Sequence, residues 1–87
     1  MIAYILYNRD TPEQRRAEDL AKRLTLEQVE AELLDADSPR GIQLCADYDI
    51  LGRPAVVLVG ASGTPVQVWQ GADSLPTPSD VAYLAHQ

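Results

Sequence analysis

The stretch that decides the fold of this chain runs from Leu44 to Val59 and reads LCADYDILGRPAVVLV. Its last five residues, from Ala55 onward, are all apolar, which predicts a strand covered on both faces in the middle of a sheet. The segment before the Gly-Arg-Pro turn predicts a short helix, because Ser38 is a good N-cap and Pro39 suits the first helical position. The residues that we expect this helix to turn toward the core are Ile42, Cys45 and Tyr48.

The N-terminal part of the chain predicts a strand followed by a helix. Ile2–Tyr7 is apolar or aromatic at every position, which indicates a second central strand. We expect Thr11 to be the N-cap of a helix whose first residue is Pro12, with Gln14 completing a capping box. One apolar stripe then recurs at helical spacing, through Ala17, Leu20, Ala21 and Leu24. On the outer face we expect the i,i+4 ion pairs Glu18–Lys22 and Asp19–Arg23.

The remaining segments predict an edge strand, a hairpin and a final helix. Val29, Ala31 and Leu33 alternate with glutamates, which is typical of a half-exposed strand near a sheet edge. A Gly-containing turn separates Val66–Gln70 from the preceding apolar strand, so the two strands form a hairpin. Thr77 then caps a last helix. The predicted order is β-α-β-α-β-β-α, a single α/β domain over residues 1–87 with a four-stranded mixed sheet flanked by helices.

The composition is that of a small acidic domain, with a formal net charge of −6. An acidic surface repels phosphates, so we expect neither nucleic acid nor an anionic membrane as a partner. The single cysteine, Cys45, excludes an internal disulfide and a cysteine-based zinc site, and it suits a reducing cytoplasm. We expect no signal peptide and no membrane span. Asp35 and Asp37 share a turn, but two carboxylates are too few to predict a metal site, and no cofactor is expected.

The segment Leu44–Val59 resembles the part of the thioredoxin and glutaredoxin superfamily in which a helix ends near a tyrosine and Gly-x-Pro leads into an apolar strand. The resemblance implies a minimal thioredoxin-like fold for nearly the whole chain. It also implies that Pro54 is the cis-proline that faces the active site of these proteins. The Gly71–Ala72 pair after the last strand resembles the family too.

The chain departs from the family at the active site. The resemblance places Thr11 and Gln14 where the family has the two cysteines of its C-x-x-C motif at the start of the first helix. Neither residue can form a thiolate or a disulfide, and thiol–disulfide exchange needs a thiolate as attacker. We therefore expect no catalytic residue. The binding positions implied by the family active site are Thr11, Gln14, Arg53 and Pro54.

Several of these residues have two interpretations. Arg53 could bind a carboxylate near the start of the first helix, with Arg9 adding charge, or it could be a solvated arginine in a turn. Cys45 is interpreted as a buried structural residue, and a redox-sensing thiol is the alternative. Tyr7 and Trp69 are expected to have packing roles, although a tyrosine after the first strand activates glutathione in some glutathione transferases.

Three functions follow from this sequence. The first is a redox-inactive module that binds a protein or peptide partner of unknown identity through the cis-proline region, by strand-like pairing that needs no sulfur. The second is a glutathione-binding protein or glutaredoxin-like oxidoreductase, with glutathione supplying the thiol. The third is a structural domain of a larger assembly. The absence of the dithiol makes the first our main hypothesis and argues against an enzyme.

Overall fold

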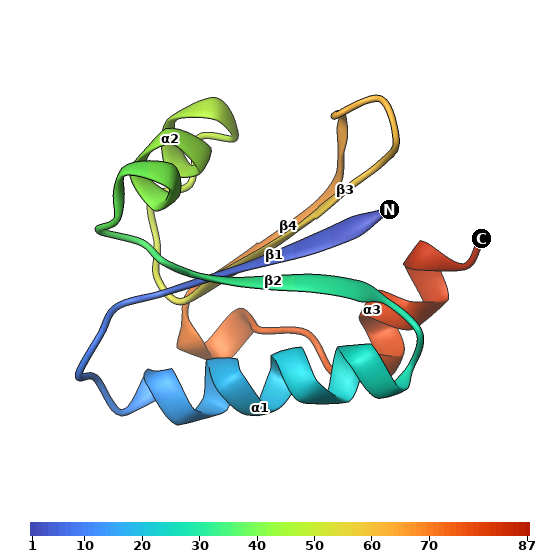
Figure 1. The fold of residues 1–87 in the computed structure, drawn as a ribbon, viewed down its shortest axis with the longest axis horizontal. Helices are drawn as coiled ribbons and strands as arrows, with labels where there is room; N and C mark the ends of the chain where they lie inside the picture. The colour runs from blue at the N-terminus through green and yellow to red at the C-terminus, as the bar shows by residue number, and fades with distance from the viewer.

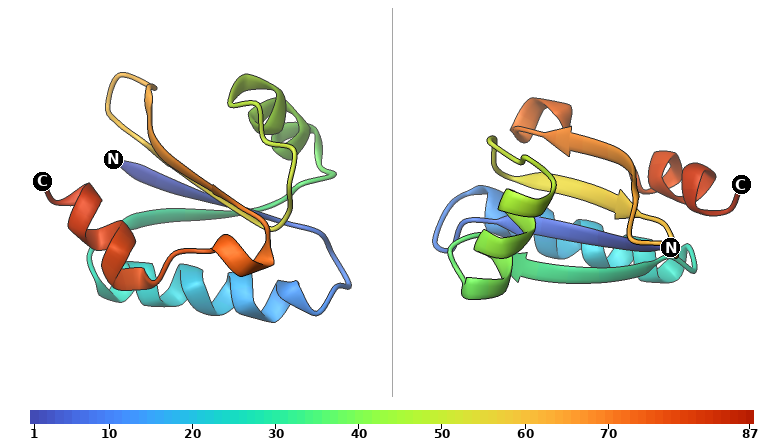
Figure 2. Two further views of the ribbon diagram at one scale, coloured as in Figure 1. Left: turned by 180° about the vertical axis from the view of Figure 1, so that it is seen from behind. Right: turned by 90° about the horizontal axis from the view of Figure 1, so that it is seen from above.

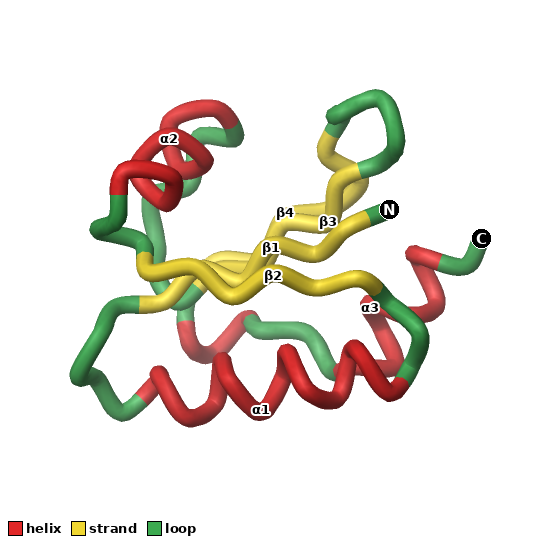
Figure 3. The backbone as a smooth tube through the Cα atoms, viewed as in Figure 1, coloured by secondary structure: helices red, strands yellow, loops and turns green.

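The computed structural model describes all of residues 1–87 and has the element order that the sequence predicts. Figure 1 shows the fold as a ribbon, and Figure 3 shows a central sheet with helices on both sides. The elements are β1 (Ile2–Tyr7), α1 (Glu13–Leu26), β2 (Glu30–Asp35), α2 (Pro39–Asp47), β3 (Ala55–Val59), β4 (Pro65–Gln70), the 3₁₀ turn η1 (Ala72–Ser74) and α3 (Pro78–Ala85). The α/β prediction and its four-stranded mixed sheet are confirmed.

The sheet has the strand order β2-β1-β3-β4, which is visible in the right view of Figure 2. β1 and β2 are parallel, whereas β3 is antiparallel to both β1 and β4. The two strands predicted to be central are central, and all five residues of β3 are buried. The alternating strand β2 is at one edge, as its pattern predicts, because only a strand with one protected face tolerates regularly spaced glutamates.

The two faces of the sheet are covered unequally. α1 and α3 lie on one face, and α2 lies alone on the other (Figures 1 and 2). The α1 side holds a cluster of ten buried apolar residues, which includes Ala17, Leu20 and Leu24 from the predicted stripe. The α2 side holds a smaller cluster of seven, which includes Cys45. None of the helices has the length and apolar character that a membrane-spanning helix needs.

The starts of α2 and α3 follow the sequence signals. Ser38 is the N-cap of α2, and its hydroxyl oxygen accepts a hydrogen bond from the Gly41 N–H at 3.1 Å. Thr77 caps α3 in a full capping box with Asp80, whose N–H donates to the Thr77 hydroxyl at 3.1 Å. Both caps satisfy N–H groups that have no partner inside the helix.

Two details of the helix faces differ from the prediction. Ile42 is 56% exposed rather than buried. The buried residues of α2 are Gly41, Leu44 and Cys45, and at 100° per residue Ile42 points away from the face they define. On α1, Arg23 pairs with Asp19 at 3.0 Å, but Glu18 and Lys22 form no ion pair. Pairs of this kind are exposed and contribute little, so packing does not require them.

Candidate functional site

The loops that carry the predicted site residues meet at one end of the sheet. β1 and β2 are parallel and β3 runs the opposite way, so the end of β1 lies beside the start of β3. The register pairs Leu6 with Ala55 and Tyr7 with Asp35. The start of α1, the loop before β3 and the turn after β4 are therefore gathered at this end, at the left of Figure 1.

Thr11 does not cap α1, and the predicted capping box is wrong. The N-cap is Pro12, which has no side-chain cap, and the Thr11 hydroxyl instead donates to the Asn8 carbonyl oxygen at 2.7 Å. Asp10 has a φ of 58°, in the left-handed region. This conformation turns the Asp10 N–H toward the helix, where it donates to Gln14 Oε1 at 2.9 Å. Gln14 thus accepts a main-chain N–H as the glutamine of a capping box does, but the donor is Asp10 and not the predicted Thr11.

Pro54 and its neighbours form a well-anchored loop at the start of β3. The Arg53–Pro54 peptide bond is cis, Pro54 is buried, and its carbonyl oxygen accepts from the Gly71 N–H at 2.9 Å. Gln70 Oε1 accepts from the N–H groups of Leu51 and Gly52 at 2.8 and 3.0 Å. The last residue of β4 and the glycine after it therefore fix the position of this loop.

Arg53 is exposed, and its main chain has no hydrogen-bond partner within the protein. Neither its N–H nor its C=O takes part in any backbone or side-chain hydrogen bond of the chain. Its guanidinium makes one contact, from Nη2 to Cys45 Sγ at 3.8 Å, and it has no carboxylate partner. We call Arg53 and Pro54 the 53–54 ledge.

The sequence did not predict the contact between Arg53 and Cys45. Cys45 is 8% exposed and packs in the apolar cluster on the α2 side, so the prediction that it is buried is confirmed. The loop after α2 brings the guanidinium back over the thiol. No local pattern signals this, because the two residues belong to different elements.

Two of the other cations at this end have partners within the protein, whereas Arg15, on the first turn of α1, is exposed and forms no ion pair. Arg9, which was expected to add charge near the start of α1, forms an ion pair with Asp35 at 3.2 Å. Arg16 Nη1 donates to the Ala72 carbonyl oxygen at 2.8 Å, which ties η1 to α1. No sequence signal marks this role of Arg16, since the two residues are far apart in the chain. The guanidinium of Arg53, in contrast to those of Arg9 and Arg16, has no oxygen partner within the protein and is free to bind an anion.

Three further residues complete this end of the sheet. Tyr7 and Trp69 are half-buried and pack against the cluster on the α1 side, which agrees with their expected packing roles. Asn8 Oδ1 is buried without a hydrogen-bond partner, and no sequence signal singled it out. An unpaired buried oxygen is costly in free energy. No group of three His, Cys, Asp or Glu residues is placed to hold a metal ion.

Comparison with known proteins shows the fold. Thioredoxin 1 from the thermophilic eubacterium Thermosipho africanus TCF52B superposes with a TM-score of 0.62 at 12% sequence identity. The match covers 99% of this chain and 91% of that chain. No family model and no curated protein matches the sequence. The fold is therefore thioredoxin-like, as the resemblance of Leu44–Val59 implied.

Proposed function

We propose that this chain is a peptide-binding module that works without redox chemistry and presents the 53–54 ledge to an extended segment of a partner. The observation that carries the proposal is the unpaired main chain of Arg53, which is exposed beside the buried Pro54. An extended peptide can pair with a free N–H and C=O as an added strand does. Because the loop is already fixed by Gln70 and Gly71, little ordering would be needed on binding.

The chemistry of the neighbouring side chains supports the absence of a redox role. Thr11 and Gln14 carry a hydroxyl and an amide, and both are engaged in hydrogen bonds that hold the 8–14 loop. Thiol–disulfide exchange needs a thiolate with access to its target. The chain's one thiol, on Cys45, is buried in an apolar cluster on the α2 side.

Hydrogen exchange on the ledge tests the proposal. Peptides selected from a displayed random library would be added to ¹⁵N-labelled protein, and amide exchange would be followed by NMR. We expect the Arg53 amide to exchange fast in the free chain and to be protected in the complex. Arg53→Ala keeps the main chain and should keep the binding. Selected peptides that leave the Arg53 amide unprotected would contradict the proposal.

A disulfide-exchange assay tests the redox part separately. We expect the native chain to show no exchange with oxidised glutathione above that of Cys45→Ser. The double variant Thr11→Cys/Gln14→Cys is the matched control, because it restores a dithiol at the two family positions. Exchange by the native chain that Cys45→Ser abolishes would refute the assignment of a redox-inactive module.

Glutathione is the second candidate ligand, and the free guanidinium of Arg53 favours it. Arg53 has no carboxylate partner, and glutathione carries two carboxylates. Titration with millimolar reduced glutathione should shift the amides of residues 11–15 and 53–55 if this is correct. Arg53→Ala should abolish those shifts, whereas it should spare main-chain pairing with a peptide. Unshifted amides would remove glutathione as a ligand.

A further inference from the structure

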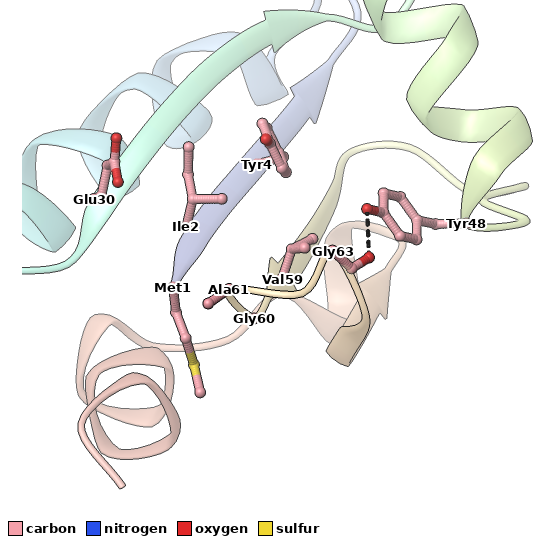
Figure 4. A pocket seen from close by; sticks show the side chains of 9 residues that line it. All are labelled: Met1, Ile2, Tyr4, Glu30, Tyr48, Val59, Gly60, Ala61 and Gly63. Atoms are coloured by element: carbon pink, nitrogen blue, oxygen red, sulfur yellow. Dashed lines mark hydrogen bonds between the residues drawn. The ribbon is translucent and has the colours of Figure 1, made fainter.

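The chain has a hollow at the end of the sheet away from the 53–54 ledge, on the α2 side. Its volume is about 350 Å³, and it lies between the C-terminal end of α2, the start of β1 and the β3–β4 hairpin (Figure 4). Ile2 and Val59, which pair across β1 and β3, supply apolar lining. Tyr4 and Tyr48 line it with their rings, and Glu30 lines it from β2.

The hollow exists because α2 is too short to cover its face of the sheet. α2 has nine residues and lies over one end, as the right view of Figure 2 shows. Tyr48, directly after α2, reaches across to the hairpin turn, where its hydroxyl donates to the Gly63 carbonyl oxygen at 3.1 Å. This bond joins the two walls, so the hollow is part of the native packing around Tyr48.

One charged side chain, that of Glu30, lines the hollow. It is exposed and forms no ion pair or hydrogen bond with another side chain. Glu32, two residues along the same strand, is already neutralised by Arg40, with Nε–Oε1 and Nη2–Oε2 distances of 3.2 and 3.3 Å. The hydrogen bonds that the Arg40 guanidinium donates to the Glu32 carboxylate raise the pKa of Arg40. Of these two carboxylates, that of Glu30 is therefore the one without an ion-pair partner.

The aromatic lining also suits a cation. The Arg40 guanidinium lies 5.7 Å from the centre of the Tyr4 ring, within the range of a cation–π interaction. A ring of the hollow thus already takes part in such a contact within the fold. Met1 adds apolar surface at the rim of the hollow, where it is 48% exposed.

We propose that this hollow binds a lysine side chain that a partner protein presents between apolar residues. The alkyl stem would lie along Ile2 and Val59 while the ammonium group pairs with Glu30, since lysine combines an apolar stem with a charged end. Apolar residues on either side of the lysine would meet the rim. The net charge of −6 favours encounter with a basic partner. The site is separate from the ledge and does not depend on the proposed function.

A pair of peptides of similar shape that differ in one ammonium group tests this inference. The blocked tripeptide Ac-Leu-Lys-Leu-NH₂ and its norleucine analogue, which lacks the ammonium group, would be titrated at millimolar concentration and low salt. NMR amide shifts would locate the binding. We expect shifts at Tyr4, Glu30, Val59 and Gly63, and binding of the lysine peptide about two- to fivefold tighter than that of the analogue, as for a partly exposed ion pair.

Two variants with the same loss of charge complete the experiment. Glu30→Gln should remove the preference for the lysine peptide, whereas Glu18→Gln, on α1 at the other face of the sheet, should retain it. Equal binding of the two peptides to the native chain would overturn the inference, as would a preference that survives in Glu30→Gln. Shifts confined to residues 11–15 and 53–55, or no shifts at all, would also overturn it.

Discussion

Replacing Gly41 by alanine should destabilise the protein although the residue lies within a helix. A Cβ atom at this position would overlap the Asp35 carbonyl oxygen and lie 2.9 Å from Ala36 Cα. Both atoms belong to the main chain, so no side-chain rotation can relieve the overlap. The start of α2 would have to move away from the turn that follows β2, and the Arg40–Glu32 ion pair beside it would be disturbed.

The expected magnitude follows from two opposing effects. Glycine to alanine within a helix stabilises by roughly 0.5–1 kcal/mol. Overpacking a close contact costs about 1–3 kcal/mol, and an overlap with main-chain atoms belongs at the upper end of that range. The free energy of unfolding should therefore fall by about 1–2 kcal/mol. This is a substantial part of the roughly 4–13 kcal/mol expected for a domain of this size.

Urea unfolding is the assay, followed by far-UV circular dichroism and by the fluorescence of Trp69, the single tryptophan. Gly60→Ala is the matched control, because a Cβ there would meet nothing closer than the Thr64 carbonyl oxygen at 3.7 Å. That variant should be as stable as the native chain or slightly more stable. A Gly41→Ala protein with undiminished stability would refute the close approach of α2 to the turn.

Substitutions at three further positions test the packing and the ledge. Gln70→Leu removes the acceptor of the Leu51 and Gly52 N–H groups, so the hydrogen exchange of these two amides should accelerate. Gln70→Glu keeps an acceptor oxygen and should preserve their protection. Equal exchange rates in the two variants would argue against this anchor. Ser38→Ala should lower the free energy of unfolding by about 1 kcal/mol through loss of the α2 N-cap, measured by urea unfolding. Leu58→Ala should cost about 2–5 kcal/mol in the same assay, because Leu58 is fully buried; a smaller loss would contradict its central position.

The order of elements could be predicted because each has a local signal. The unbroken apolar runs of β1 and β3 place these strands in the middle of the sheet, and the alternation in β2 places it at an edge. Ser38 and Thr77 mark the helix starts, since capping is a contact between near neighbours in the chain. The Thr11 side chain can either cap α1 or donate to the Asn8 carbonyl oxygen, and the sequence does not show which of these two hydrogen bonds forms.

The candidate site could be predicted only in part. The Gly-Arg-Pro turn and the missing cysteines identified the positions Thr11, Gln14, Arg53 and Pro54, and the register of β1 with β3 brings their loops to one end of the sheet. What each side chain touches could not be read from the sequence. The contact of Arg53 with Cys45 depends on how a loop folds over a helix.

The sequence by itself therefore determined the strands, the helices and the absence of a dithiol, because these depend on residue type and on spacing along the chain. The tertiary structure alone decided that the Arg53 main chain is unpaired, that Arg9 is paired with Asp35, and that a hollow beside Glu30 opens where α2 ends. These features join residues from separate elements. They depend on how elements distant in the chain lie against one another, which no local pattern encodes.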